Sequence, residues 1–361
     1  MKKKSLSAKK IIPEIFNFKK ILKNKKIYEN YISFLNNFKN YGNSKKVAIS
    51  VSGGPDSLAL CFLISYYNSQ TNNKIKPFFY LIDHGLRKNS EKEARQVKKH
   101  LKLKKIDLKI LKWVGKKPKS NLQSLARQKR YSLLFEECKK NNINIIVTAH
   151  HQDDFYETFF SRLLRGSGTE GLSSFAEIES KINFKGSSFK IVRPLLNLNK
   201  EKLTYITKNV FNFYVNDPSN EMDKFQRVRI RKLISNLKNE GLDFHKLNLT
   251  LNNLSSTNKA INEIVGLNII KNAIFKNKTY IINSNFFLFP DEVVFRSLSK
   301  LIKNLNGKDY APRGRKMTNL IKNLKDKEHF KATLGGTIIK KLHNSVIVIK
   351  EKRKKGKFAT I

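Results

Sequence analysis

The residues best suited to chemistry form the run Ser52-Gly53-Gly54-Pro55-Asp56-Ser57. Two glycines let the backbone turn sharply and bring N–H groups close to an anionic ligand. Ser57 can cap a following helix, whose N-terminus favours an anion. Asp56 would repel a bare phosphate, so its place in the turn indicates a bound metal ion, Mg²⁺, that neutralises the phosphate. The run therefore predicts a nucleotide site; the alternative is a purely structural glycine-rich turn.

This run differs from two common phosphate loops. No Gly-Lys-Ser/Thr follows the glycines, so it is not a Walker loop. The spacing Gly-x-Gly-x-x-Gly is absent, so it is not the dinucleotide-binding fingerprint either. A third kind of phosphate site is required.

A second cluster reads His150-His151-Gln152-Asp153-Asp154-Phe155-Tyr156-Glu157. On a helix, Asp153, Asp154 and Glu157 can share one flank and hold Mg²⁺ or the ammonium group of a substrate. The alternative is that the acids only complement the helix dipole. His151 could bind substrate or metal-bound water, and a structural histidine is the other interpretation.

The elements that must position these clusters alternate between strands and helices. Apolar runs at 47–51, 78–82, 108–114 and 144–148 predict strands, and 58–67, 91–103 and 122–138 predict helices. This alternation is typical of a doubly wound, mostly parallel α/β sheet. Ligands bind such sheets at the carboxyl ends of the strands, where both clusters and Asp83-His84-Gly85-Leu86-Arg87 fall.

Changes in composition and in the pattern of apolar residues along the chain predict three parts. Residues 1–44 form a basic arm, which either packs on the main domain or contacts nucleic acid. Residues 45–235 form the catalytic domain. Residues 236–361 contain a helical linker and a smaller α+β domain, with strands at 335–339 and 346–349 and a charged tail at 350–357.

Charge dominates the composition: 73 Lys and Arg stand against 28 Asp and Glu in 361 residues, a formal net charge of +45. This favours a polyanionic partner and excludes a near-neutral enzyme acting alone on small cations. Lys, Asn and Ile are abundant throughout, so part of the charge is compositional bias. The hydrophobic fraction of 40% is enough for real cores and excludes a disordered chain.

The two cysteines, Cys61 and Cys138, form no disulfide framework, CxxC pair or zinc spacing. Cys61 is predicted to be a small core residue. The chain starts Met1-Lys2-Lys3-Lys4 without a following apolar stretch, and no apolar run approaches the ~20 residues that span a bilayer. A cytoplasmic location and no membrane partner are expected.

The first run resembles the N-type ATP pyrophosphatases of the PP-loop superfamily, whose signature is Ser-Gly-Gly-x-Asp-Ser after the first strand. The chain also resembles the tRNA(Ile)-lysidine synthase family, in which several stretches match in order. These are 52–57, 83–87, Ala126-Arg127 with Arg130-Tyr131, 149–171, 193–196, 217–220, and Arg227, Arg229, Ile230 and Arg231. Two positions depart from the family pattern: Val228 stands where Asn is frequent, and Thr337 where Cys is common.

The resemblance implies a Rossmann-like PP-loop ATPase. It would be a ligase that adenylates the C2 oxygen of the wobble cytidine of tRNA(Ile), anticodon CAU. The ε-amine of free L-lysine would then displace AMP. The resulting lysidine changes decoding from AUG to AUA. ATP, Mg²⁺ and L-lysine would be required, and a homodimer is possible because family members are often dimers.

The resemblance also implies roles for individual residues. Catalytic residues would be Asp56, His151, Asp154, Glu157 and Arg127. ATP-binding residues would be Ser52, Gly53, Gly54, Pro55, Asp56, Ser57 and His84, with Asp56 also holding Mg²⁺. tRNA-binding residues would be Arg130, Arg165, Arg227, Arg229 and Arg231. A solvated basic face is the alternative interpretation for Arg127 and Arg130.

Three rival functions differ in the residues they need. A sulfur-transfer enzyme of the same superfamily would use a Cys pair or a CxxC-held cluster. An amidotransferase-type ligase needs a glutaminase part, and none is evident. A basic RNA-binding protein with an inactive nucleotide loop is the rival from another class, and the completeness of the loop argues against it.

Overall fold

The computed structural model describes residues 21, 23–41, 44–70, 75–86, 89–115, 122–173, 178–216, 226–307, 312 and 314–351. Most of the predicted N-terminal arm, Arg87, the 217–220 motif and the 352–357 part of the charged tail lie outside these residues. Contacts divide the chain into two compact units, residues 1–247 and 248–361. Each unit is described by itself.

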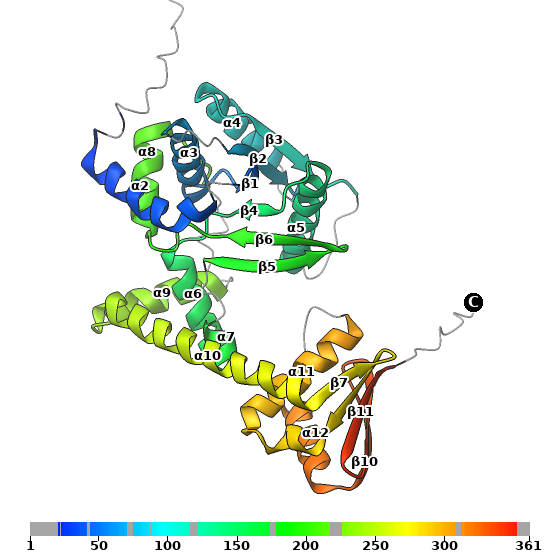
Figure 1. The fold of residues 1–361 in the computed structure, drawn as a ribbon. Coiled ribbons are helices and arrows are strands. Elements are labelled where there is room, and N and C mark those ends of the chain that lie inside the picture. Colours follow the sequence, from blue (N-terminus) through cyan, green and yellow to red (C-terminus); the bar gives the residue numbers. More distant parts are fainter. Residues whose placement is uncertain are drawn as a thin grey trace, which may run out of the picture. The chain divides into compact units, whose positions relative to one another are not determined.

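Unit 1 is built on a six-stranded sheet in the order β3-β2-β1-β4-β6-β5 (Figure 1). Its strands are β1 Lys46–Val51, β2 Lys76–Asp83, β3 Leu108–Lys112, β4 Ile145–Val147, β5 Glu179–Phe184 and β6 Ser187–Val192. All neighbouring strands are parallel except the β5–β6 pair. The predicted doubly wound, mostly parallel α/β fold is confirmed.

Helices cover both faces of this sheet. The helices of unit 1 are α2 Lys25–Phe38, α3 Pro55–Gln70, α4 Ser90–Leu103, α5 Leu122–Lys140, α6 Gln152–Leu163, α7 Thr169–Ser173, α8 Lys200–Phe211 and α9 Gln226–Asn239, and those that pack on the sheet are α2, α3, α4, α5 and α8. One core joins α2, α3, α4 and α8 to the sheet face that carries Val47 and Ile49. A second core joins α5 to the opposite face, which carries Ala48 and Tyr80. Cys61 is fully buried in α3, as predicted.

The order of the strands explains where a ligand can bind. Strand β1 lies between β2 and β4, and its partners in register are Ala48↔Ile146 and Ile49↔Val147 on the β4 side. The chain leaves β1 toward β2 and β3, and later returns on the other side as β4. Ligands of doubly wound sheets bind at such a reversal of strand order. The loops after β1 and β4 therefore meet at the place expected for a site.

Unit 2 is an α+β fold. Helix α10, Phe244–Asn272, runs into it from the end of unit 1. The remaining elements are β7 Ala273–Lys276, β8 Thr279–Asn283, α11 Asp291–Asn306, α12 Arg315–Asp326, β9 His329–Leu334, β10 Thr337–Leu342 and β11 Ser345–Lys350. The five strands form an antiparallel sheet in the order β7-β8-β11-β10-β9. Its core contains residues of the sheet, α11 and α12.

One predicted strand of unit 2 starts later than expected. The strand predicted at 335–339 begins at Thr337, because Gly335 (φ +64°) and Gly336 (φ +85°) form the turn that precedes it. A Cβ at Gly335 would also lie 2.7 Å from Pro312 Cγ, so the close approach explains glycine there. Among the described residues, no helix is long and apolar enough to span a membrane.

Candidate active site

The loop after β1 makes its turn at Gly53, whose φ of +86° is in the left-handed region. A Cβ at this position would lie 2.7 Å from Val97 Cγ2, so the residue must be glycine for both conformation and space. Gly54 has no such restriction, since its nearest neighbour would be Ser52 Oγ at 3.6 Å. The two glycines of the motif therefore have different jobs.

Ser57 organises the loop from the first turn of α3. Its Oγ accepts hydrogen bonds from the N–H groups of Ser52 (3.2 Å) and Gly53 (3.1 Å) and donates one to Gly54 O (3.0 Å). Helix α3 starts at Pro55, which has no N–H to leave unpaired. The first N–H groups of a helix and its dipole attract anions, so the loop is a cradle for phosphate.

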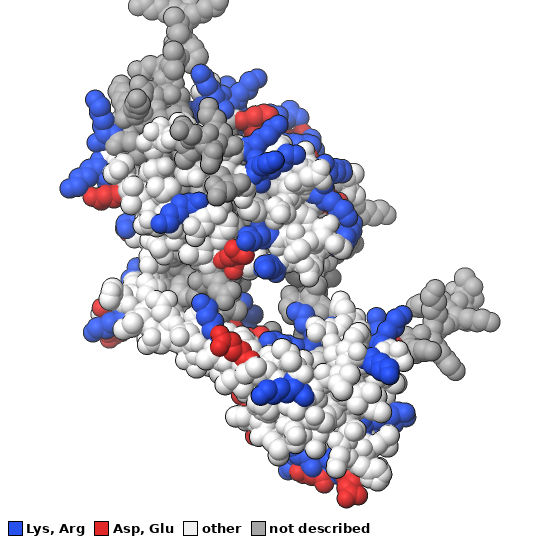
Figure 2. All heavy atoms as spheres, in the orientation of Figure 1, with Lys and Arg blue, Asp and Glu red and all other residues white. Residues whose placement is uncertain are grey.

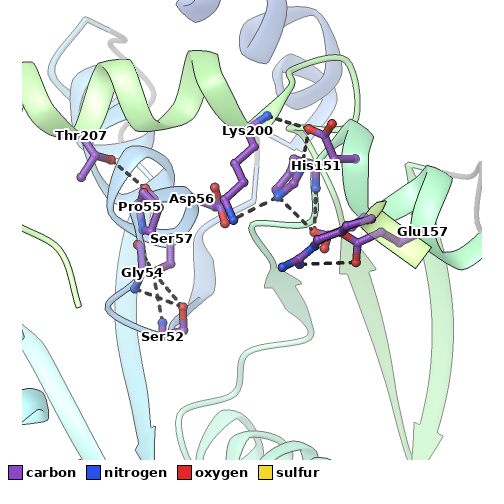
Figure 3. Close-up of polar contacts among 12 residues, drawn as sticks. Ser52, Gly54, Pro55, Asp56, Ser57, His151, Glu157, Lys200 and Thr207 are labelled. Carbon is purple, nitrogen blue, oxygen red and sulfur yellow. Dashed lines mark hydrogen bonds and ion pairs between the residues drawn. The ribbon is translucent and has the colours of Figure 1, made fainter. Parts of the chain in front are cut away.

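The segment after β6 supports this loop from a distance of about 150 residues in sequence. Thr207 Oγ1 on α8 donates a hydrogen bond to Pro55 O (2.7 Å) (Figure 3). Val215 N–H donates one to Gly53 O (2.9 Å). Thr207 is fully buried. The shape of the loop thus depends on α8 as well as on its own sequence.

His151, which follows β4, is surrounded by the carboxylates of Asp56, Asp153 and Asp154. We call these four residues the His151 cluster, and the distances below are measured from the His151 ring. Its Nε2 lies 3.5 Å from Asp56 Oδ2 and 3.6 Å from Asp154 Oδ2, and its Nδ1 lies 3.4 Å from Asp153 Oδ2 (Figure 3). Asp153 also accepts a hydrogen bond from the backbone N–H of Lys200 at the start of α8 (2.7 Å). The cluster therefore joins the phosphate loop, α6 and α8.

The pKa values of the two neighbouring histidines are shifted in opposite directions. Burial alone would lower the pKa of His151, but the close contacts with the carboxylates of Asp153 and Asp56, together with the Asp154 charge, raise the pKa to about 10. Burial lowers the pKa of His150 to about 4, and the charges of Arg193, Arg127 and Arg227 act in the same direction, against Asp154. His151 is thus a buried cation, whereas His150 is neutral.

Glu157 lies on α6, beyond the cluster, and is buried. Its carboxylate pairs with the guanidinium of Arg231 on α9, with 2.5 Å between Nε and Oε1. Burial nevertheless raises the pKa of Glu157, and the Arg231 charge only partly opposes this. A carboxyl group whose pKa is moved toward neutrality is suited to accept and return a proton.

A cavity of about 610 Å³ opens beside these groups, between α6, α8 and α9. Asp153 and Glu157 line it on one side, and α8 and α9 supply both charged and apolar groups. The lining also includes Tyr156, Lys200, Glu201, Thr204, Tyr205, Lys208, Arg231, Ile234, Ser235 and Lys238. Its size suits a small ligand, and its polar groups suit one that carries charges of both signs.

The fit of a Mg²⁺ ion rests on Asp56. Its Oδ1 is buried and makes no hydrogen bond with the described residues. Among those residues, no group of three or more His, Cys, Asp or Glu side chains could hold a metal by itself. Mg²⁺ is commonly held by one or two carboxylates together with phosphate oxygens and water. Asp56 therefore fits an ion that arrives with ATP.

The predicted basic residues fall in two settings. Arg127 and Arg130 are exposed on α5, and the charges of Arg127 and Arg227 act on both His150 and Arg130. Arg165 is exposed at the end of α6, where its Nη2 contacts Gln226 Oε1 (3.2 Å). Arg229 is exposed on α9, whereas half-buried Arg231 points inward to Glu157.

His84 follows β2, half-buried, with its ring 6.2 Å from that of Trp113. Motif reasoning missed the contribution of α8 through Thr207 and the Lys200 N–H. One local signal was available: Asn199 is a strong N-cap residue, and its side chain accepts the N–H of Lys202 (3.0 Å). That signal predicts a helix start, but not its contact with the phosphate loop.

The parallel sheet, its reversal of strand order and the anion cradle at that point define an ATP-binding protein of the PP-loop class; the family model for the PP-loop domain matches residues 24–237. The tRNA(Ile)-lysidine synthase of Wolbachia pipientis wMel is 33% identical over 85% of this chain and 71% of that protein. The enzyme of the same name from Rickettsia typhi is 30% identical over 91% of this chain and 75% of that protein. The chain belongs to the tRNA(Ile)-lysidine synthase family.

A solved structure supports the fold. The U34-tRNA thiolase NcsA from Methanococcus maripaludis, determined with its [4Fe-4S] cluster, superposes with a TM-score of 0.54 at 17% sequence identity. The match covers 67% of this chain and 81% of the thiolase. At this level of identity the likeness concerns architecture only.

Proposed function

We propose that this protein ligates free L-lysine to C2 of the wobble cytidine of tRNA(Ile), using ATP and releasing AMP and diphosphate. The observation that carries the proposal is the contact of His151 Nε2 with Asp56 Oδ2 at 3.5 Å. It places the phosphate loop and the acidic motif of α6 in one site. The names of the relatives, which are tRNA(Ile)-lysidine synthases, support the same choice of substrates.

In the first step, the C2 oxygen of the cytidine attacks the α-phosphorus of ATP, and the bond to diphosphate breaks. The N–H groups of the first turn of α3 bind the phosphates. Asp56 would hold Mg²⁺, which neutralises phosphate charge when bound. Arg127 and Arg227, whose charges act on His150, are placed to stabilise negative charge in the transition state.

In the second step, the ε-amine of lysine attacks C2 and the C2–oxygen bond to AMP breaks. The amine must lose protons to attack, and the carboxylates of Asp154 and Glu157 are candidates to orient it and take a proton. Glu157 has the raised pKa that this exchange needs. Its pairing with Arg231 holds the carboxylate in one orientation.

Sulfur transfer within the same superfamily is the rival activity. It needs reactive thiols in the site, but Cys61 and Cys138 are buried in separate cores on opposite faces of the sheet. Burial raises the pKa of Cys138 to about 12, which keeps it as an unreactive thiol. These observations favour ligation over sulfur transfer.

We also propose that residues 45–235 carry the chemistry and that residues 236–361 help to hold the tRNA. A homodimer and a cytoplasmic location remain predictions from the family resemblance and the sequence. In the view of Figure 2, Lys and Arg side chains are spread over both units instead of being gathered at one place. On the face that Figure 2 shows, charge alone therefore does not identify a surface that binds tRNA.

The test is diphosphate release from ATP in the presence of a tRNA(Ile) transcript with the anticodon CAU, with and without L-lysine. The proposal expects diphosphate release to require the tRNA and the formation of lysidine to require lysine. A transcript with a uridine at the wobble position is the matched control and should be inactive. Absence of turnover with the CAU transcript and lysine would refute the proposal.

A further inference from the structure

The end of α6 presents an exposed apolar pair beside a cation. Leu163 and Leu164 are 47% and 62% exposed, and Arg165 follows them in the turn. We name this surface the α6 tip: Leu163, Leu164, Arg165 and the turn to Gly168. Exposure of large apolar side chains to water is unfavourable, so a partner that covers them gains binding free energy.

The α6 tip is rigid although it is exposed. Gly166 N–H donates to Leu163 O (2.9 Å), and Ser167 N–H donates to Arg162 O (3.1 Å), which closes the end of the helix. The Arg162 guanidinium also donates to Gly171 O and ties the turn to α7. A surface that is already ordered loses little conformational entropy when it binds.

Gly168 has no structural explanation of the kind that Gly53 has. Its φ is not in the left-handed region, and a Cβ there would meet nothing within 4 Å. Glycine at an open position lets another molecule approach the backbone closely. The backbone at Gly168 is therefore open to solvent, so a molecule that contacts the turn meets no side chain there.

The charge around the α6 tip selects the kind of partner. Arg165 contacts Gln226 at the start of α9, and exposed Arg227 and Arg229 follow on the first turn of that helix. Apolar side chains contact unstacked bases, and neighbouring arginines contact the phosphates. This combination fits unpaired RNA better than a base-paired stem, whose base faces are stacked.

We propose that the α6 tip is the docking surface for the unpaired nucleotides that flank the reacting base of the RNA. The inference rests on the proposed function, because it takes the reacting base to lie at the His151 cluster. Asp154 and Leu164 are ten residues apart on one helix, about 15 Å at ~1.5 Å per residue. That length corresponds to about four stacked nucleotides at ~3.4 Å each. The contact is therefore with the anticodon loop itself.

Photocrosslinking tests the position of the contact. A benzophenone amino acid replaces Leu164 in the full chain, the protein is irradiated with tRNA(Ile) transcript, and crosslinks are mapped by primer extension. The expected crosslinks fall in the anticodon loop, within about four nucleotides of the wobble base. Leu103, which is 55% exposed at the end of α4, is the matched control position and should not crosslink to that loop.

Substitution tests the energy of the contact. Leu164→Ser should weaken tRNA binding about five- to tenfold, because roughly half of a leucine's burial is lost, while Leu164→Met should restore most of it. Leu103→Ser should leave tRNA binding unchanged, and ATP binding should be unchanged in all three variants. These are exposed positions, so the variants are expected to fold.

Two results would overturn the inference. One is a crosslink from position 164 to tRNA stems or to residues 248–361 of the same chain, which would make the α6 tip a contact for another surface. The other is normal tRNA affinity of Leu164→Ser. Either result, obtained while the wild-type protein forms lysidine, would overturn the inference and leave the proposed function standing. Wild-type protein that forms no lysidine would refute the proposed function and, with it, the inference.

Discussion

The phosphate loop and the His151 cluster lie at the ends of neighbouring strands, yet they are held together in different ways. The loop is bound mainly by neutral hydrogen bonds within Ser52–Ser57, with Ser57 Oγ at its centre. The His151 cluster consists of one cation and three carboxylates from α3, α6 and the residue before α6. Asp56 belongs to both regions.

The two regions should therefore respond differently to substitution. Because its hydrogen bonds are neutral and local, the loop has its anion-binding shape before an anion binds. Buried charges are stable only while every partner is present, because an unpaired buried charge is costly. The cradle should therefore be sensitive to backbone geometry, and the charged region to the removal of single partners. The substitutions below test this comparison.

The largest effect is expected at Asp56. Asp56→Ala should lower ATP-dependent diphosphate release about a thousandfold, since the phosphate charge loses its metal ligand. Asp56→Asn, which keeps the size of the side chain, should be nearly as inactive. Filter binding should show nearly unchanged tRNA affinity for both variants. Equal losses of activity and tRNA binding would mean that Asp56 only maintains structure.

Removal of the Arg231 side chain should destabilise the protein, because it leaves the buried Glu157 carboxylate unpaired. Arg231→Met is expected to lower the free energy of unfolding by about 2–3 kcal/mol at pH 7, because Glu157 stays buried without its partner. Since the pKa of Glu157 is already raised, protonation removes the penalty, which should vanish below about pH 4.

Urea unfolding at several pH values measures this effect. In a Glu157→Gln background the same Arg231 substitution should cost less at pH 7 and should show little pH dependence. A cost that is the same at pH 4 and pH 7 in the parent protein would show that the loss comes from packing and not from the ion pair.

The glycines test the geometry of the cradle. Gly53→Ala should lower the free energy of unfolding by about 1–3 kcal/mol and weaken ATP binding, because the added Cβ meets Val97 in a left-handed conformation. Gly54→Ala should cost less than about 1 kcal/mol. Urea unfolding and nucleotide titration of both variants provide the comparison, and equal costs would contradict the assigned geometry.

The smallest effect is expected at Arg229, which is exposed on α9. Arg229→Ala should weaken tRNA binding a few-fold and reduce the salt slope of binding by about one unit or less. Binding measured from low to moderate salt supplies the slope. A slope equal to that of the wild-type protein would remove Arg229 from the phosphate contacts.

The comparison also explains which parts could be predicted from sequence. The phosphate loop, the parallel strands and the helix that carries Asp153 to Glu157 depend on local periodicity and on short motifs, so they were predictable. The contact of Thr207 with Pro55 O and the pairing of Arg231 with Glu157 join residues far apart in the chain. No local signal specifies such partners, and Arg231 was accordingly predicted only as a tRNA contact.

Val228 is a second position at which the sequence motif does not show the environment of the side chain. Asn is frequent at this position in the family pattern, and Val cannot supply its hydrogen bonds; in this chain the side chain is buried on α9. Burial of an apolar side chain explains why Val is stable at this position. Its neighbours Arg227 and Arg229 are exposed because successive helical residues point in different directions.

The central claim is that the phosphate loop and the His151 cluster together serve one lysine-ligating reaction on tRNA. The most direct measurement is the nucleoside content of tRNA(Ile) from cells depleted of this protein, determined by mass spectrometry. The account predicts that lysidine disappears, that unmodified cytidine takes its place, and that a plasmid copy of the wild-type gene, but not of Asp56→Ala, restores lysidine. Unchanged lysidine after depletion would contradict it.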